Sequence, residues 1–345
     1  MNRILIINVN WIGDVLLSTP AIRAIRRKFP TAFIACLVPP RCQALLQDNP
    51  YLNEVIVSRD RLSLFSIPEM SATLGRLRRR RFDTAIFFHR SKTKALLTLA
   101  AGIKHRWGYS AKHRDVLLTR VIPRPVERLH RTDFFLNLLR ELNIPEDGRT
   151  ADFFPNPEEM VKAERLLQEN GVSRDIPYVM VHPGGNWDLK RWPVSYFVDW
   201  ARLFLEAVGW PILLCGTLPE KAICDEIQSQ LKDKRVVNLC GGTSISMLAI
   251  LLKNAKLLLS NDSGPIHLAA SQGTKIVGLF GPTDFRQTGP LSKAPVEIVQ
   301  KDVGCEVPCY FRSCDTRVCM EWLKPQEVFE ATKRVLISHE TSPSS

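Results

Sequence analysis

Short apolar runs alternate with longer mixed segments along most of the chain. Such runs are typical of strands buried on both faces, and the segments between them place apolar residues near helical spacing. The pattern therefore predicts alternating strands and helices, which build parallel sheets. The predicted strands cover residues 3–9, 32–38, 55–57, 84–88, 178–181, 210–215, 236–239, 257–259 and 276–280. The predicted helices cover residues 15–28, 42–47, 70–81, 132–142, 158–170, 194–207, 221–231, 246–253, 266–272 and 325–337.

The alternation is interrupted between Asn143 and Pro157, where Pro, Asp and Glu are frequent and apolar residues are few. That composition is typical of a linker, and a chain of 345 residues has the length of two ordinary domains. We therefore predict an α/β protein with two Rossmann-like βαβ domains, residues 1–157 and 158–345, facing a central cleft. A cleft between two such domains is the expected ligand site.

The stretch after the predicted strand 257–259 carries a candidate anion site. Ser260, Asn261, Asp262 and Ser263 are all residues that cap helices, and they precede a Gly-Pro pair and a short predicted helix. Free N–H groups and the positive end of the helix dipole attract anions at such a corner. An ordinary capped helix in an α/β sheet remains the alternative.

The positive charge of the chain lies in its first half. Residues 1–150 hold 26 Lys and Arg against 12 Asp and Glu, a net charge of +14, whereas the whole chain has +12. The first domain should therefore meet a polyanion, and nucleic acid, anionic lipid and phosphorylated glycan all qualify. Several cations follow the predicted strand 84–88, at the end where open α/β sheets bind ligands. Any one of them taken alone could be a solvated surface charge.

Nine cysteines without a predicted signal peptide indicate reduced thiols in a cytoplasmic protein. Four of them, Cys305, Cys309, Cys314 and Cys319, have the spacing C-x3-C-x4-C-x4-C, which differs from the paired C-x2-C of common zinc sites. We expect plain thiols in a packed C-terminal loop, with a metal site or a redox disulfide as alternatives. No apolar run approaches the roughly 20 residues of a membrane helix.

Four motifs resemble, in order, those of the ADP-heptose:lipopolysaccharide heptosyltransferases, glycosyltransferase family 9. Each motif is weak alone, but together they are specific and span most of the chain. They are Trp11-Ile12-Gly13-Asp14 with Ser18-Thr19-Pro20, His182-Pro183-Gly184 with Lys190-Arg191-Trp192-Pro193, Gly216 to Glu220, and Asn261-Asp262-Ser263-Gly264 with His267 and Gly281-Pro282-Thr283. The first and last forms look more like the type II enzymes than type I, and the cysteine-rich stretch 305–319 departs from the best-known members.

The resemblance implies a GT-B fold and an inverting transfer of heptose from an ADP-heptose donor. Asp14 would be the general base that takes a proton from the acceptor hydroxyl; the alternative is a helix N-cap. Lys190 would offset charge on the departing diphosphate, and Glu220 would accept hydrogen bonds from the ribose. The remaining implied donor contacts are Gly184, Asp262 at the transferred sugar, Ser263 and Gly264 at the phosphates, and His267, for which a core histidine is the alternative.

The implied acceptor is the phosphorylated, carboxylate-rich inner core of a lipid A precursor, which explains the basic first domain. Its candidate contacts are Arg90, Ser91, Lys92, Lys94 and Arg106. No Asp-x-Asp motif is present, so we expect no metal at the diphosphate and no cofactor. We also expect peripheral contact with the cytoplasmic face of the inner membrane.

Two rival functions remain. Another GT-B enzyme, such as a nucleotide-sugar epimerase, would need no lipid acceptor and no basic first domain. A nucleic-acid-binding module would use the net charge and the run Arg78 to Arg81, but the chain has no recognised nucleic-acid motif. We therefore expect no nucleic-acid partner.

Overall fold

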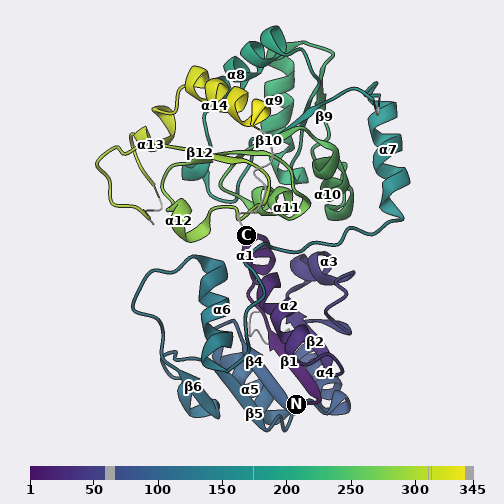
Figure 1. The fold of residues 1–345 in the computed structure, drawn as a ribbon, viewed down its shortest axis with the longest axis vertical. Coiled ribbons are helices and arrows are strands. Elements are labelled where there is room, and N and C mark those ends of the chain that lie inside the picture. Colours follow the sequence, from purple (N-terminus) through teal and green to yellow (C-terminus); the bar gives the residue numbers. More distant parts are fainter. Residues whose placement is uncertain (59–66, 174, 310, 312, 339–345) are drawn as a thin grey trace. The chain divides into compact units, whose positions relative to one another are not determined.

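The computed structural model describes residues 1–58, 67–173, 175–309, 311 and 313–338. The chain forms two compact units, Met1–Phe154 and Pro155–Ser345. The division therefore falls after Phe154, close to the position after Pro157 that composition indicates. Each unit has its own sheet flanked by helices (Figure 1).

Unit 1 contains a parallel six-stranded sheet in the order β3-β2-β1-β4-β5-β6. Its strands are β1 Arg3–Ile7, β2 Phe33–Val38, β3 Glu54–Val57, β4 Thr84–Phe87, β5 His105–Tyr109 and β6 Arg120–Ile122. Its helices are α1 Ile12–Leu17, α2 Thr19–Lys28, α3 Gln43–Leu46, α4 Ile67–Arg80, α5 Lys92–Ala100 and α6 Arg131–Glu141.

Unit 2 contains a second parallel six-stranded sheet, in the order β12-β11-β10-β7-β8-β9. Its strands are β7 Val179–His182, β8 Ile212–Leu214, β9 Val236–Asn238, β10 Leu257–Asn261, β11 Ile276–Phe280 and β12 Val296–Gln300. Its helices are α7 Glu159–Glu169, α8 Val194–Ala207, α9 Lys221–Leu231, α10 Ile245–Asn254, α11 Gly264–Gln272, α12 Phe285–Thr288, α13 Val318–Glu321 and α14 Pro325–Ile337.

Both sheets have the same strand order when each is counted from its own first strand, and this is the order of the Rossmann fold. The order reverses between β1 and β4 in unit 1, and between β7 and β10 in unit 2. Ile7 pairs with Phe87, and His182 pairs with Ser260, so the segments that leave these strands emerge at one edge. Ligands of open α/β sheets bind at such switch points.

Each unit has its own apolar core. In unit 1 the buried faces of β1, β2 and β4 pack with Leu77 and Phe82. In unit 2 Trp192, Trp200 and Phe204 pack with buried residues of the strands. The rings of Trp200 and Phe204 stack with centroids 5.1 Å apart.

A buried arginine holds the C-terminal segment of unit 1 in place. Arg23 of α2 is 8% exposed and donates to the side chains of Asp147 and Asp152 and to the carbonyl oxygen of Thr150. The Asp152 amide donates in turn to the Thr19 hydroxyl at 2.7 Å. These contacts hold the segment 147–152 against α2, directly before the division between the units.

The structure corrects several predicted bounds. The single helix predicted over 15–28 is two helices, because the helix stops at Ser18, whose hydroxyl donates to the Val15 carbonyl, and restarts with Pro20 in its first turn. The sequence pattern missed three strands. β5 begins with the polar residues His105 and Arg106, and it lies between β4 and β6. The other two are β6, which has only three residues, and β12, whose Glu297 and Gln300 interrupt the apolar run. Both are edge strands.

Candidate functional site

The switch point of unit 2 brings two of the sequence motifs together through Asn261. This side chain is fully buried at the end of β10. Its amide nitrogen donates to the carbonyl oxygens of Pro183 and Gly184, and its amide oxygen accepts from the Trp192 backbone N–H. Asn261 thus fixes the glycine-rich turn after β7 beside the end of β10.

Glu220 lies in this site with both carboxylate oxygens hydrogen-bonded. Oε1 accepts from the Gly185 amide at 2.7 Å, and Oε2 accepts from the amide and the hydroxyl of Thr217. Burial alone would raise the pKa of Glu220, but the hydrogen bond and charge of His182 and the bonds from Thr217 hold it well below its usual range. The carboxylate is therefore ionised and held in one orientation.

Two glycines leave the space that this carboxylate fills. A Cβ at Gly184 would lie 2.1 Å from Oε1 of Glu220, and a Cβ at Gly216 would lie 3.1 Å from Oε2. The sequence motifs named both glycines, and the structure gives the physical reason for them.

Gly184→Ala is expected to displace the Glu220 carboxylate, lower stability by about 1–3 kcal/mol as overpacking does, and weaken ADP binding. Thermal denaturation and calorimetric titration with ADP measure the two effects. Gly242→Ala is the matched control, because its Cβ would meet only a carbonyl oxygen at 3.4 Å. If Gly184→Ala bound ADP as tightly as the parent, Glu220 would have no part in nucleotide binding.

A lysine and a carboxylate form an ion pair at the same edge. Nζ of Lys190 lies 2.7 Å from Oδ2 of Asp262, and the Thr283 hydroxyl donates to the same oxygen at 2.7 Å. The Asp262 side chain is 5% exposed and that of Lys190 is 20% exposed. The pair joins the segment after β7 to the ends of β10 and β11.

The first turn of α11 lies at the end of β10. Ser263 is its N-cap residue, and the Ser263 hydroxyl lies 3.0 Å from Nδ1 of His182 rather than bonding to its own helix. Gly264 is the first helical residue, and His267 lies buried one turn along. The structure therefore brings Gly184, Lys190, Glu220, Asp262, Ser263 and Gly264 to one edge of the sheet.

The switch point of unit 1 holds a cavity of about 320 Å³. Asn10, Trp11 and Asp14 line it from the segment after β1, while His89 and Arg90 line it from the segment after β4. The other lining residues are Val9, Phe88, Arg124, Arg131 and Phe134. Sequence reasoning named Asp14 and Arg90 but missed Arg124 and Arg131, which come from distant positions.

Asp14 is the third residue of α1, and the N-cap of that helix is Trp11. The alternative role of Asp14 as an N-cap is therefore wrong. Its two carboxylate oxygens accept from Nε and Nη2 of Arg131, each at 3.2 Å. The carboxylate is 21% exposed, and thus reachable from the cavity.

The cavity concentrates positive charge. Burial lowers the pKa of Arg90, and the charges of Arg124 and Arg131 lower it further. Behind them, Arg114 is 1% exposed and donates to the carbonyl oxygens of His89 and Tyr109. Its pKa is lowered by burial and by the charges of Arg124 and Arg90, although Asp115 opposes this. Such crowding of like charge favours an anionic ligand.

The other predicted acceptor residues lie in different surroundings. The Ser91 hydroxyl caps α5 by accepting from the Lys94 amide, and Lys92 is exposed. Lys94 is buried, and its Nζ donates to Oδ1 of Asn10 at 3.3 Å. Arg106 is not brought to this group, because it pairs with Ala85 near the amino end of β4 and donates to the Ile103 and Leu117 carbonyls.

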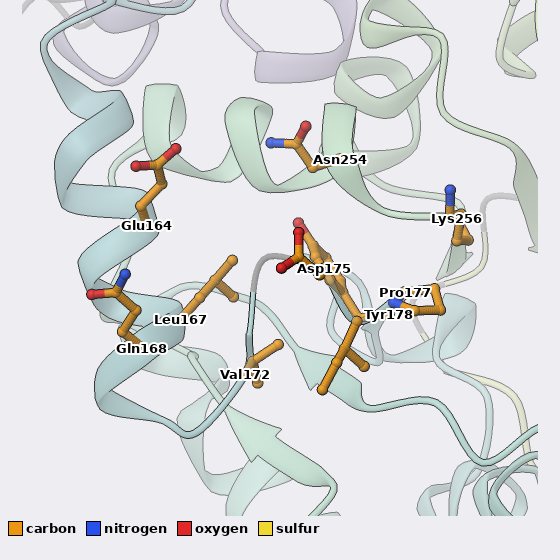
Figure 2. A pocket seen from close by; sticks show the side chains of 10 residues that line it. Glu164, Leu167, Gln168, Val172, Asp175, Pro177, Tyr178, Asn254 and Lys256 are labelled. Atoms are coloured by element: carbon orange, nitrogen blue, oxygen red, sulfur yellow. The ribbon is translucent and has the colours of Figure 1, made fainter.

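A second cavity, of about 470 Å³, lies away from both switch points. It is bounded by Glu164, Leu167 and Gln168 of α7 and by residues that precede β7 and β10, such as Pro177 and Lys256 (Figure 2). It therefore lies at the amino ends of the strands, opposite the edge that carries the glycine-rich turn.

The four clustered cysteines differ from the expected packed loop. Cys305 and Cys314 are exposed, and Cys309 and Cys319 are half-buried. Backbone amides of Arg317 and Thr316 hydrogen-bond to Cys314 and hold its pKa below the usual value. Among the described residues, no three His, Cys, Asp or Glu side chains are arranged to hold a metal ion. Within the same residues, no helix combines the length and apolar character needed to cross a bilayer.

Two Rossmann-type units, each with a parallel six-stranded sheet flanked by helices, are the architecture of the GT-B class. The chain belongs to glycosyltransferase family 9, the heptosyltransferases, which matches residues 71–315. Lipopolysaccharide heptosyltransferase 2 of Escherichia coli is 29% identical over 304 residues, which cover 84% of this chain and 86% of that protein.

Solved structures agree with this assignment. The E. coli ADP-heptose lipopolysaccharide heptosyltransferase II superposes with a TM-score of 0.80 at 25% identity, over 97% of this chain and 98% of that one. The UDP-GlcNAc 2-epimerase of Methanocaldococcus jannaschii, at 13% identity and a TM-score of 0.57 over 99% of this chain and 94% of that one, shares the fold alone. The rival epimerase function therefore has only a distant structural likeness.

Proposed function

We propose that this chain transfers heptose from ADP-heptose to the inner core of lipopolysaccharide, on a heptosyl-Kdo2-lipid A type acceptor, with inversion at the anomeric carbon. The observation that carries the proposal is Asp14, an accessible carboxylate in an otherwise cationic cavity at the switch point of unit 1. An anionic acceptor needs such cations, and its hydroxyl needs a base. An epimerase has no acceptor, so it would need neither cations for an acceptor anion nor a base for an acceptor hydroxyl.

In this proposal unit 2 binds the donor. Glu220 accepts hydrogen bonds from the ribose, and the start of α11 with Ser263 and Gly264 faces the diphosphate. Lys190 offsets the charge that develops on the departing ADP. Asp262 contacts the transferred sugar, and Gly184 keeps the space in which Glu220 lies.

Unit 1 binds the acceptor and supplies the base. Asp14 takes the proton of the acceptor hydroxyl, whose oxygen forms the new bond to the anomeric carbon. The bond from that carbon to the phosphate oxygen breaks, and its electron pair leaves with ADP. Arg90 and Arg124 offset the anionic groups of the acceptor, and Lys94 supports the cavity wall through Asn10.

Product analysis by mass tests the function. The chain is incubated with a panel of nucleotide sugars and with lipid A acceptors that lack or carry the first heptose. The expected product is the heptosyl-bearing acceptor with one further heptose, formed only with ADP-heptose. Conversion of the nucleotide sugar, without an acceptor, to an isomer of the same mass that separates by chromatography would instead indicate epimerisation.

We further propose that the protein lies at the cytoplasmic face of the inner membrane through electrostatic contact. Supporting this are the +14 charge of residues 1–150 and the lipid-linked acceptor.

Vesicles containing anionic lipid are expected to bind the protein at low salt and to release it at 1 M salt, where the screening length shortens to about 3 Å. Cosedimentation with anionic and neutral vesicles measures this, the neutral vesicles being the control. Retention on anionic vesicles at 1 M salt would contradict an electrostatic attachment.

A further inference from the structure

Arg131 contacts Asp14 in a two-point geometry. Its Nε and Nη2 each donate to a different oxygen of the carboxylate, at 3.2 Å. A planar fork of this kind fixes the plane of a carboxylate, which one point charge would not do. One N–H occupies each oxygen, so each oxygen retains a lone pair for a further donor.

The guanidinium of Arg131 is itself held in place. Arg131 is the first residue of α6, and the imidazole of His130 accepts from the Thr132 amide to cap that helix. The guanidinium carbon also lies 5.6 Å and 5.9 Å from the ring centroids of Phe135 and Phe134. Such cation–π contacts restrict the rotation of the side chain.

The charges in the cavity affect what happens to the Arg131–Asp14 ion pair when Asp14 takes a proton. Asp14 is the only carboxylate among the described lining residues, and it shares the cavity with Arg90, Arg124 and Arg131. When Asp14 takes a proton it loses its negative charge, which leaves Arg131 without a counter-ion. An anion of the acceptor in the same cavity would replace that counter-ion.

We propose that Arg131 is a positioning residue, which holds Asp14 in the orientation for proton abstraction and passes its ion pair to an anionic group of the acceptor. This inference rests on the proposed function for the reaction itself. In the step, the acceptor O–H bond breaks and an O–H bond forms on Asp14. Meanwhile the Arg131 N–H groups move from the carboxylate to the acceptor anion.

The competing explanation is that Arg131 and Asp14 form an ordinary surface ion pair, which would contribute little to stability and nothing to turnover. Arg149 offers a matched control, because it binds Asp133 with the same two-point geometry, at 2.7 and 2.6 Å, and does not line the cavity. Both pairs involve α6.

The test is a double-mutant cycle on turnover. Arg131→Ala is expected to lower kcat by about 10²-fold, as small misplacements of reacting groups do, while the KM for ADP-heptose stays unchanged. Arg149→Ala should leave kcat unchanged. In an Asp14→Asn background, Arg131→Ala should add almost nothing, because Arg131 acts through Asp14. Guanidinium ion at millimolar concentration should restore part of the kcat of Arg131→Ala only where Asp14 is intact.

A second cycle does not depend on activity. Inorganic phosphate, titrated by calorimetry, should bind Asp14→Asn more tightly than the parent, because Arg131 is then released. That gain should shrink when Arg131 is also replaced by Ala. If the Asp14 and Arg131 substitutions changed kcat independently of each other, and phosphate affinity likewise, the inference would be overturned. If the phosphate cycle shows coupling but the parent transfers no heptose, the proposed function fails while the shared ion pair stands.

Discussion

Asp14→Asn is expected to reduce heptosyl transfer by about 10²–10⁴-fold, the range typical of a lost general base. The amide has nearly the shape of the carboxylate but cannot take the acceptor proton. Since Asp14 lies inside the first turn of α1 and does not cap it, the substitution removes no cap. The lost ion pair with Arg131 should cost about 0–1 kcal/mol. The ADP affinity of the Asp14→Asn variant should equal that of the parent, because the proposed nucleotide contacts belong to unit 2.

Turnover, thermal midpoint and ADP affinity, measured on one preparation, check this expectation. Asp133→Asn is the matched control. Asp133 also accepts hydrogen bonds from Nε and Nη2 of an arginine, Arg149, and it lies in unit 1 outside the cavity. That control should lose similar stability and no turnover. Near-parental turnover in Asp14→Asn would remove Asp14 from the role of base.

Lys190→Ala is expected to lower turnover by about 10²-fold or more, the size of a lost electrostatic contact in a transition state. The structure adds a second effect. Lys190 neutralises Asp262, which is 5% exposed, and removal of one partner of a buried pair costs about 3–5 kcal/mol. The bond from Thr283 to the same oxygen remains and offsets part of that cost. A loss of turnover could therefore arise from catalysis or from stability.

Two further variants separate these effects. Lys190→Ala combined with Asp262→Asn removes the unpaired charge and should recover stability. Its turnover is compared with that of Asp262→Asn alone, because Asp262 itself belongs to the proposed donor site, and it should stay below that reference. Lys221→Ala is the control, because Lys221 pairs with Asp225 on the exposed face of α9. If Lys190→Ala turned over at the parental rate below its thermal midpoint, Lys190 would have no part in the reaction.

The sequence was sufficient for the parts of the site that follow strand ends. Apolar runs mark the strands, and parallel pairing brings their carboxyl ends to one edge, so Arg90 and Asp262 could be predicted from position along the chain. Asp14 was singled out only by the resemblance of its motif to the family. Arg131 could not be predicted, because it reaches the cavity from the start of α6, and no local pattern states where that helix packs. Arg124 likewise arrives from the loop after β6, a strand of three residues that the pattern missed.

Counting cations was a poorer guide than locating strand ends. Arg106 and Arg90 are equally basic in the sequence, yet Arg106 lies near the amino end of its strand and Arg90 follows the carboxyl end of another. Lys94 is only four residues from Arg90, but helical geometry turns it inward to Asn10. Which face of a helix a cation occupies depends on packing, which composition does not contain.

The contact of Arg23 with the C-terminal segment of unit 1 has a consequence for how such proteins diversify. Because Arg23 binds the segment 147–152 and each unit has its own core, a crossover after Phe154 would separate neither the Arg23 contacts nor the residues of either core. Under the proposed assignment, in which unit 1 binds the acceptor and unit 2 the donor, the two choices could then be inherited separately, by recombination between genes that differ in one half. Under that assignment, a chain joined from two parents at this position would pair the acceptor of one with the donor of the other.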